Sequence, residues 1–314
     1  MNTLKILAKI SFSASVVFFL LWKKVDVHGI INALSQASIG WIMLSFLLHP
    51  VGLFISTHRW HLLLQAQAIN VSMNRLYLSY LVCGFFNQFL PTRVGGDLIR
   101  VYDTKVMGYS GSKSFAVVFV ERGSGILMLF LLALVAATYR LCQGSTDLLY
   151  WAGLSVGLAG LGSVILVCHP VPISYFTRFI SWLNMERLNS RLTTFNETTV
   201  SYWRKGKQKQ FKVAFFLAFL LQINVVLHYY FLGLAFTFHQ GLPFFEYFII
   251  IPLVQVILMF PFFINGIGLR EVSWIYLLGL YGLSSDTAFA YSLLDFTMYL
   301  IFGILGGIIY ALRR

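Results

Sequence analysis

Charged residues are scarce in this sequence. Asp, Glu, Lys and Arg make up only 11% of its 314 residues, while 58% are hydrophobic; an ordinary soluble domain has about 25% charged residues. A soluble core of this size could not bury so much apolar surface. The composition therefore excludes a soluble enzyme, a coiled coil and a disordered chain. It predicts an all-α polytopic membrane protein in which residues 1–314 form a single integral membrane domain.

Cysteine and the motifs of soluble catalysis are also lacking. The three cysteines form no CxxC pair, which excludes a disulfide-stapled module. No Walker loop, HExxH or GxSxG motif occurs, so the sequence encodes no ATP-driven mechanism. The 23 basic residues against 11 acidic ones indicate retention of Lys and Arg in cytoplasmic loops. We expect no nucleic-acid partner, no metal and no cofactor.

Nine apolar runs divide the chain. They cover about residues 4–22, 39–64, 76–90, 115–139, 148–168, 211–237, 244–260, 272–282 and 289–311. A full span needs about 20 residues, so the third run and the pair 244–260 and 272–282 are short. Basic residues flank both ends of the third run, which indicates that it enters and leaves on one side. We therefore predict about six spanning helices plus two re-entrant helical hairpins, at Pro91–Gly96 and Pro261–Gly268.

The two halves of the chain have the same order of runs. Runs that start at 39, 76 and 115 pair with those at 211, 244 and 289, and the two turns share the pattern P-x4-G-x3-R at an offset of about 170. Opposite entry sides for the two hairpins predict an inverted-topology repeat, with residues 1–140 as the first repeat and 148–314 as the second.

A basic segment connects the repeats. Residues 169–212 hold eight Lys and Arg, and apolar residues at helical spacing from Phe176 to Leu183 favour an amphipathic helix. We predict a cytoplasmic amphipathic and basic connector, with both chain termini in the cytoplasm of a cell whose inner (plasma) membrane holds the protein. An ordinary helix packed on other loops is the alternative for this segment.

The first turn is the strongest candidate site. A proline ends the preceding helix, two glycines permit positive φ and close approach of a ligand, and the next helix begins near Asp97. Exposed N–H groups and two arginines there would form a pocket for a phosphate. The predicted ligands of the lipid headgroup are Arg93, Gly95, Gly96, Asp97 and Arg100, with Asn87 in a secondary role. The alternative is a glycine-containing turn whose charges lie in cytoplasmic water.

The second turn provides an equivalent set of residues: Asn265, Gly266, Arg270 and Glu271. A charge at the bilayer centre costs about 2.5–3.5 kcal/mol on insertion scales, so Arg270 and Glu271 need a partner or a water-filled cavity. We predict a headgroup site here as well. An ion pair that only supports packing, or a position at the outer interface, is the alternative.

Three charged residues, Arg59, Glu121 and Arg122, lie in the long apolar runs. Glu121 and Arg122 are adjacent, so they do not form a local helical pair; they either anchor at the interface or line the cavity beside the first turn. Arg59 and Trp60 near the end of the second run are interpreted as an interfacial anchor. We expect no metal at His58 and His61, since no third ligand is evident.

These residues resemble a known family. Arg59-Trp60, the stretch from Asn87 to Arg100, the Glu121-Arg122-Gly123 element and the stretch from Pro261 to Glu271 look like the lysylphosphatidylglycerol synthase transmembrane region, also called flippase-like. In bifunctional members this region is thought to flip an aminoacylated lipid, and a separate soluble domain transfers the amino acid. That domain is not in this sequence, so lysyl transfer is not implied and we expect a transporter rather than an enzyme.

Three functions remain open at this point. The first is a lipid flippase for an anionic phospholipid or a lipid-linked (polyprenyl-phosphate or glycolipid) substrate, with membrane lipids as partners and proton coupling through Asp97, Glu121 or Glu271. The second is an intramembrane lipid-modifying transferase. The third is a non-catalytic partner of a glycosyltransferase. The glycine-rich fifth and last runs favour close helix packing, either within one chain or in a homo-oligomer.

Overall fold

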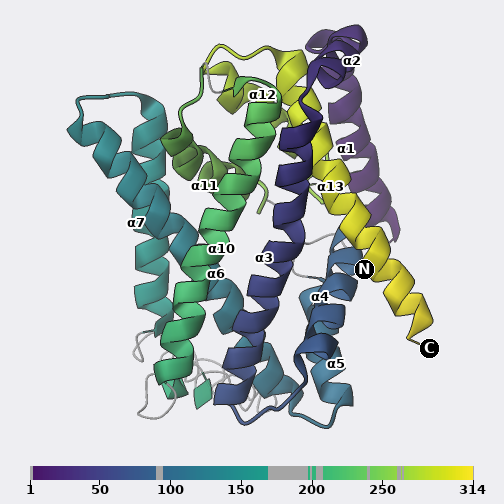
Figure 1. Ribbon diagram of the computed structural model, residues 1–314, viewed down its shortest axis with the longest axis vertical. Coiled ribbons are helices and arrows are strands. Elements are labelled where there is room, and N and C mark those ends of the chain that lie inside the picture. Colours follow the sequence, from purple (N-terminus) through teal and green to yellow (C-terminus); the bar gives the residue numbers. More distant parts are fainter. Residues whose placement is uncertain are drawn as a thin grey trace.

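The computed structural model describes residues 3–89, 95–168, 197–198, 200–202, 208–238, 241–259, 263 and 265–313. Helices and their connections account for these residues (Figure 1). In chain order the helices are α1 (Thr3–Lys23), α2 (Val27–Gln36), α3 (Ile39–Ala66), α4 (Met73–Phe89), α5 (Asp97–Val106), α6 (Gly111–Cys142), α7 (Leu148–Cys168), α10 (Gln208–Ala235), η2 (Phe244–Glu246), α11 (Tyr247–Ile257), α12 (Leu269–Gly279) and α13 (Ser285–Leu312).

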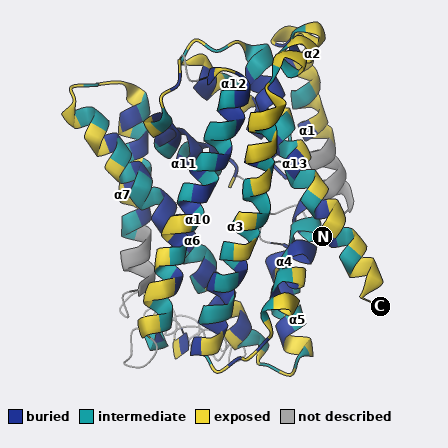
Figure 2. Ribbon diagram, viewed as in Figure 1, coloured by how far each residue is buried: buried dark blue, intermediate teal, exposed yellow. Residues whose placement is uncertain are grey.

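Each predicted apolar run coincides with a helix, which confirms the all-α membrane architecture. Helices α3, α6, α10 and α13 are long and apolar enough to cross a membrane, and shorter apolar helices lie at Ser11–Lys23, Leu148–Gly162 and Phe244–Ile257. Only 6% of the most apolar window of α3 is buried, and exposed residues follow the outer faces of the bundle (Figure 2). An apolar surface of this extent requires lipid as its solvent. The number of spans, about six, stays a prediction.

The order of helices repeats, and the equivalent helices run in opposite directions (Figure 1). The second half repeats the order of the first: α10 is equivalent to α3, η2 with α11 to α4, α12 to α5, and α13 to α6. The paired elements begin 169, 171, 172 and 174 residues apart, in that order. The α4–α5 hairpin lies in the lower half of the molecule and the α11–α12 hairpin in the upper half. This arrangement is the one that an inverted repeat requires. Re-entry of the two hairpins into a membrane stays a prediction.

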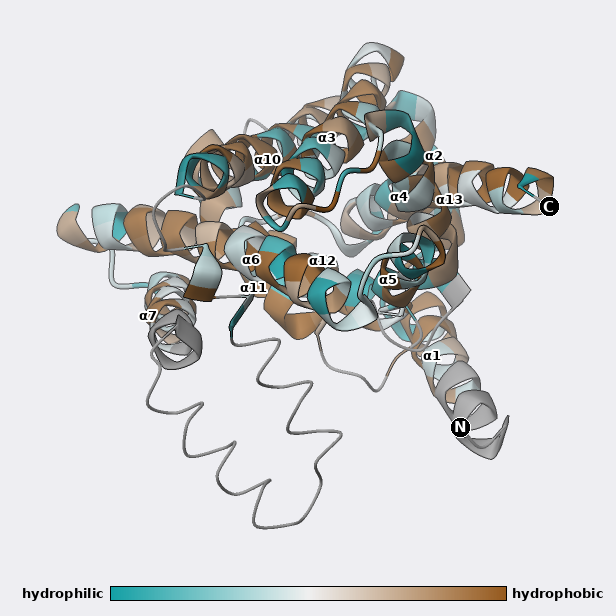
Figure 3. Cartoon of the chain, turned by 90° about the horizontal axis from the view of Figure 1, so that it is seen from below, coloured by the Kyte–Doolittle hydropathy of each residue, from teal (hydrophilic) through white to brown (hydrophobic). Residues whose placement is uncertain are grey.

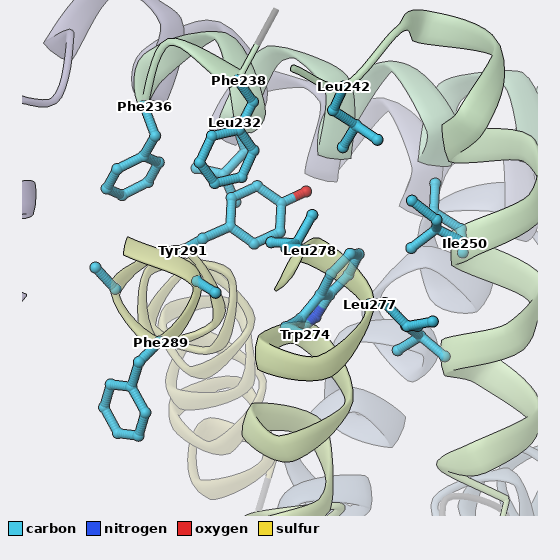
Figure 4. Packing of buried hydrophobic residues seen from close by; sticks show 14 of the residues in the cluster. Leu232, Phe236, Phe238, Leu242, Ile250, Trp274, Leu277, Leu278, Phe289 and Tyr291 are labelled. Atoms are coloured by element: carbon cyan, nitrogen blue, oxygen red, sulfur yellow. The ribbon is translucent and has the colours of Figure 1, made fainter. Parts of the chain in front are cut away.

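Helices α3 and α10 form the largest contact between the two halves, and they lie side by side when the bundle is seen from below (Figure 3). The second half also has a dense aromatic core. The centre of the Tyr291 ring lies 4.9 Å from that of Trp274 and 5.2 Å from that of Phe238 (Figure 4). This core holds α12 and α13 against the end of α10.

The glycines of the last helix pack within the chain. A Cβ added at Gly306 would collide with the backbone oxygen of Leu81, and one at Gly303 with the Gln88 side chain, so α13 and α4 approach closely. Gly157 and Gly160 of α7 meet Leu134 and Phe130 of α6 in the same way. Both glycine faces are thus occupied within one chain, and a homo-oligomer stays a prediction with no glycine face to support it.

One short helix lies outside the predicted runs. Helix α2 was not predicted, because it is too short and too amphipathic to register as an apolar run. Asp26 caps it by accepting a hydrogen bond from the His28 N–H at 3.3 Å.

The connector 169–212 lies mostly outside the described residues, its predicted amphipathic helix included. Its described part packs on the end of α3, where the Tyr202 hydroxyl donates to the Leu63 carbonyl at 2.9 Å.

Candidate functional site

Gly96, at the end of the first turn, packs closely against α4. The Gly96 N–H donates to Asn87 Oδ1 at 2.8 Å, and a Cβ on Gly96 would collide with the backbone oxygen of Cys83. Gly96 has a φ of −65°, so the expectation of positive φ is wrong for this residue. The glycine is needed because a helix, rather than a ligand, lies against it. Gly95 is buried beside it, and Arg93 lies outside the described residues.

Helix α5 begins at Asp97 and carries two charged side chains inward. Arg100 Nη1 lies 3.1 Å from Asp97 Oδ1 and 3.0 Å from Glu121 Oε2 on α6. Arg122 Nε also contacts Asp97 Oδ2. The structure therefore brings together four residues that the sequence analysis considered for the site, two of them, Glu121 and Arg122, only as a cavity-lining alternative.

Arg59 of α3 completes the group. Its Nη1 lies 3.2 Å from Glu121 Oε1, and its Nη2 donates to the Glu121 carbonyl at 2.7 Å and to Ser124 Oγ at 2.9 Å. The interpretation of Arg59 and Trp60 as an interfacial anchor is wrong, because Arg59 is 1% exposed and Trp60 fully buried. Burial of a charge in helix α3 is possible because α6 supplies the carboxylate. We call Arg59, Asp97, Arg100, Glu121 and Arg122 the arginine cluster.

The arginine cluster carries more positive than negative charge. Three guanidinium groups face two carboxylates, which leaves one excess positive charge among the described residues. Arg100 lies over the rings of Trp60 and Tyr80, 4.2 Å and 4.0 Å from their centres. Its Nε and Nη2 atoms, and the Nε atom of Arg59, have no hydrogen-bond partner among the described residues although they are buried. Unpartnered buried donors of this kind mark a place where an acceptor is expected.

The second turn has its own backbone requirements. Asn265 and Gly266 have φ values of 50° and 73°, and Gly268 has a φ of 88°. Glu271 Oε2 accepts the Gly268 N–H at 2.6 Å and so caps α12. The glycine is required at 268, since L-residues rarely adopt this conformation.

Arg270 and Glu271 satisfy each other. Arg270 Nη2 lies 2.8 Å from Glu271 Oε1, the guanidinium lies 4.3 Å from the Phe296 ring centre, and Ser292 Oγ is 3.4 Å from Glu271 Oε1. Both charges are buried. The alternative of an ion pair that supports packing therefore describes Arg270 and Glu271 in this structure, and their role in headgroup binding stays a prediction.

A histidine–aspartate pair lies next to the second turn. His228 Nε2 of α10 is 3.1 Å from Asp295 Oδ1 of α13, and the Tyr229 hydroxyl donates to Asp295 Oδ2 at 3.3 Å. The sequence analysis did not select Asp295. It was detectable, because an acidic residue inside an apolar run is by default a candidate for function.

A further buried carboxylate lies at the opposite end of the molecule from α5. Glu246 accepts from Arg140 Nη2 at 2.8 Å, from the Tyr150 hydroxyl at 3.2 Å and from the Tyr281 hydroxyl at 2.8 Å. Burial, and then the hydrogen bond to Glu246, raise the pKa of Tyr281 well above its ordinary value, so this hydroxyl remains a donor. The sequence analysis missed this group, because its members come from four separate segments. Its members bond to one another, which indicates a structural role.

In the part of the chain that the structure describes, four membrane-length apolar helices with buried charges between them define a multi-pass α-helical membrane protein. The family model described as the lysylphosphatidylglycerol synthase TM region matches residues 6–307, so the chain belongs to that family. The suspected resemblance is thereby confirmed, and the family places the chain among membrane proteins associated with lipid handling. A comparison with curated proteins finds no match.

Proposed function

We propose that this protein moves an anionic lipid across the membrane, and that the arginine cluster binds the phosphate of its headgroup. The observation that carries the proposal is the excess positive charge of the cluster together with the unpartnered N–H groups of Arg100 and Arg59. A phosphate offers oxygen acceptors to several N–H groups at once, and guanidinium groups bind it in a bidentate manner. The lipid tails would remain in the bilayer.

The position of the cluster supports access from one side only. Arg100, Arg59, Asp97 and Glu121 are buried, but the Arg122 side chain is 37% exposed. Arg122 bonds to Asp97, which also bonds to Arg100, so a headgroup that binds Arg122 competes with Asp97 for this guanidinium. The first charge that an incoming phosphate meets is therefore Arg122.

The distribution of charge supports the expected orientation. The helix ends and loops where α3 meets α4 carry Arg75, Lys105, Lys113, Lys209, Lys212 and Arg313 against Asp103 and Glu197 among the described residues. The opposite end carries Asp26, Asp147, Glu246 and Asp286 against Lys23, Lys24 and Arg140. By the retention of basic residues we infer that the α3–α4 end is cytoplasmic. The arginine cluster would then take lipid from the cytoplasmic leaflet of the cell membrane.

The proposal is for transport without chemical change of the lipid. An intramembrane transferase would need an acid, base or nucleophile free to react. The two carboxylates of the cluster are instead each bonded to two arginines, Asp97 to Arg100 and Arg122, and Glu121 to Arg59 and Arg100. Such carboxylates position the guanidinium groups and keep them charged.

The test is transbilayer movement of fluorescent phosphatidylglycerol in proteoliposomes, measured as the fraction that dithionite bleaches over time, with fluorescent phosphatidylcholine as the zwitterionic comparison. We expect the wild type to move phosphatidylglycerol faster than phosphatidylcholine. Arg122→Ala should slow this movement about tenfold or more, the loss expected from one charge-assisted contact of about 1.5–3 kcal/mol.

Arg75→Ala is the matched control, since Arg75 is exposed at the same end of the molecule. Unchanged movement by a correctly inserted Arg122→Ala protein would contradict the proposal. A change in the mass of the lipid during the assay would favour the transferase.

A further inference from the structure

A buried basic–acidic pair in the first half of the molecule has a counterpart at the equivalent position of the second half. Arg59 of α3 and His228 of α10 are 169 residues apart, which is the offset between the starts of these two helices. Glu121 of α6 and Asp295 of α13 are 174 residues apart, again the offset between their helices. The Arg59–Glu121 contact of 3.2 Å thus has its counterpart in the His228–Asp295 contact of 3.1 Å.

The two pairs differ in one chemical respect. An arginine keeps its charge at every physiological pH, whereas a histidine gains and loses a proton in that range. We propose that the His228–Asp295 pair is a proton-binding site and that its protonation controls the arginine cluster of the first repeat. Control of the arginine cluster rests on the proposed function of that cluster, whereas proton binding by the His228–Asp295 pair does not.

The hydrogen bonds around His228 allow two arrangements of protons. Ring atom Nδ1 lies 2.9 Å from Ser45 Oγ and 3.0 Å from the Ser45 carbonyl, and Ser45 Oγ lies 2.9 Å from the His228 carbonyl. When Ser45 Oγ donates to Nδ1, Nε2 donates to the Asp295 carboxylate and the pair carries one negative charge. When Ser45 Oγ donates to the His228 carbonyl, Nδ1 donates to the Ser45 carbonyl, and a second proton between Nε2 and Asp295 makes the pair neutral. A proton gained or lost by the pair therefore switches the Ser45 hydroxyl between two acceptors.

The surroundings would make the loss of this proton consequential. His228 is 7% exposed and Asp295 9%, so deprotonation leaves a carboxylate in an environment that penalises an unpaired charge. Tyr229 would still donate to Asp295. Arg270 of α12 acts on Asp295 electrostatically but is itself bonded to Glu271.

The other helices packed against α10 contribute one further titratable ring. On α3, His49 lies 5.9 Å from His228, ring centre to ring centre, and stacks on Phe302 at 4.6 Å. On α13, Tyr291 and Tyr299 lie nearby. Helix α11 has no acidic or basic residue. On α6, apart from Lys113 near its start, the acidic and basic residues belong to the arginine cluster or to the Glu246 group.

A small, mostly apolar cavity of about 30 Å³ lies between residues that contact the two sites. Its lining includes His49, Tyr299 and Tyr80. His49 lies beside His228, and the Tyr80 hydroxyl donates to Glu121 Oε2 at 2.9 Å. The two sites therefore share the lining of one cavity, through which a change in the charge of the His228–Asp295 pair would act on Glu121.

The test uses the full chain in nanodiscs with two independent measurements. The first is ¹⁵N NMR of histidine-labelled protein between pH 5 and pH 8, with His228→Gln to identify the His228 signals. The second is the affinity for phosphatidylglycerol at pH 5.5 and pH 8.0. We expect His228 to change its protonation or tautomer in this range, and the affinity of the wild type to change at least about fivefold, the low end of ordinary coupling between sites.

His228→Arg installs the fixed charge that the first repeat has at the equivalent position. It should bind phosphatidylglycerol with the same affinity at both pH values, while the control His28→Gln, an exposed histidine on α2, keeps the wild-type pH dependence. An unchanged pH dependence in both His228 variants, or His228 signals that are constant from pH 5 to pH 8, would overturn the proposal. If no variant binds phosphatidylglycerol at any pH, the proposed function fails and the NMR measurement alone decides whether the pair binds a proton.

Discussion

Substitution of Glu121 by Gln should destabilise the protein strongly. Glu121 accepts from Arg100 Nη1 at 3.0 Å, from Arg59 Nη1 at 3.2 Å and from the Tyr80 hydroxyl at 2.9 Å. Glutamine keeps the shape and removes the charge, so that three arginines then face one carboxylate. Breaking a buried pair by removal of one partner typically costs about 3–5 kcal/mol, because the other charge remains buried. We expect a loss of this size in the free energy of unfolding.

The measurement is equilibrium unfolding by SDS in mixed micelles, for Glu121→Gln, Arg59→Met and the double variant. The double variant keeps one excess positive charge, as in the wild type. Its loss in the free energy of unfolding should therefore be smaller than the sum of the two single losses, by about 1–3 kcal/mol. Asp147→Asn, at an exposed position, is the control and should change little. A loss for Glu121→Gln as small as that of Asp147→Asn, or strictly additive losses, would refute the reasoning.

Three further substitutions test the packing that holds the sites. Gly306→Ala would drive a Cβ into the backbone oxygen of Leu81 and should lower the thermal unfolding temperature, with a cost of about 1–3 kcal/mol; Gly84→Ala, with open space at the Cβ position, should not. Gly268→Ala places a side chain at φ 88° and should cost about 1–3 kcal/mol, measured by the same unfolding assay; a neutral result would show that the turn relaxes. Glu246→Gln should lower the free energy of unfolding by about 1–3 kcal/mol. The loss is moderate because the Arg140 side chain is 31% exposed. A stability equal to that of the wild type would mean that the Glu246 group contributes nothing to the stability of the protein.

Much of the fold could be predicted because a membrane simplifies the physics. Backbone groups in lipid must be satisfied internally, so apolar runs become helices, and the edges of runs such as 148–168 match the structure closely. Helix α2 was missed because it is too short to form an apolar run, while its N-terminus is marked by the cap at Asp26. The repeat was detectable since its offsets depend on helix order alone.

The site could be predicted only in part, because sequence shows which charges are unusual but not which ones meet. Asp97, Arg100, Glu121 and Arg122 lie on adjoining helices and were found. Arg59 was assigned to the interface, since a charge near the end of an apolar run usually lies there; only the packing of α3 against α6 shows that it pairs with Glu121. Asp295 and His228 come from helices far apart in the chain, and their pairing depends on the same tertiary contacts.

The most direct test of the central claim is mass spectrometry of the lipids that copurify with the wild type, Arg100→Lys and Arg75→Ala. Lysine keeps the charge of Arg100 but lacks the planar fork that binds a phosphate. The account predicts that an anionic phosphate-containing lipid is enriched on the wild type and on Arg75→Ala and is depleted on Arg100→Lys, with all three proteins folded. Equal lipid profiles on the three proteins would contradict the claim that the arginine cluster binds a lipid headgroup.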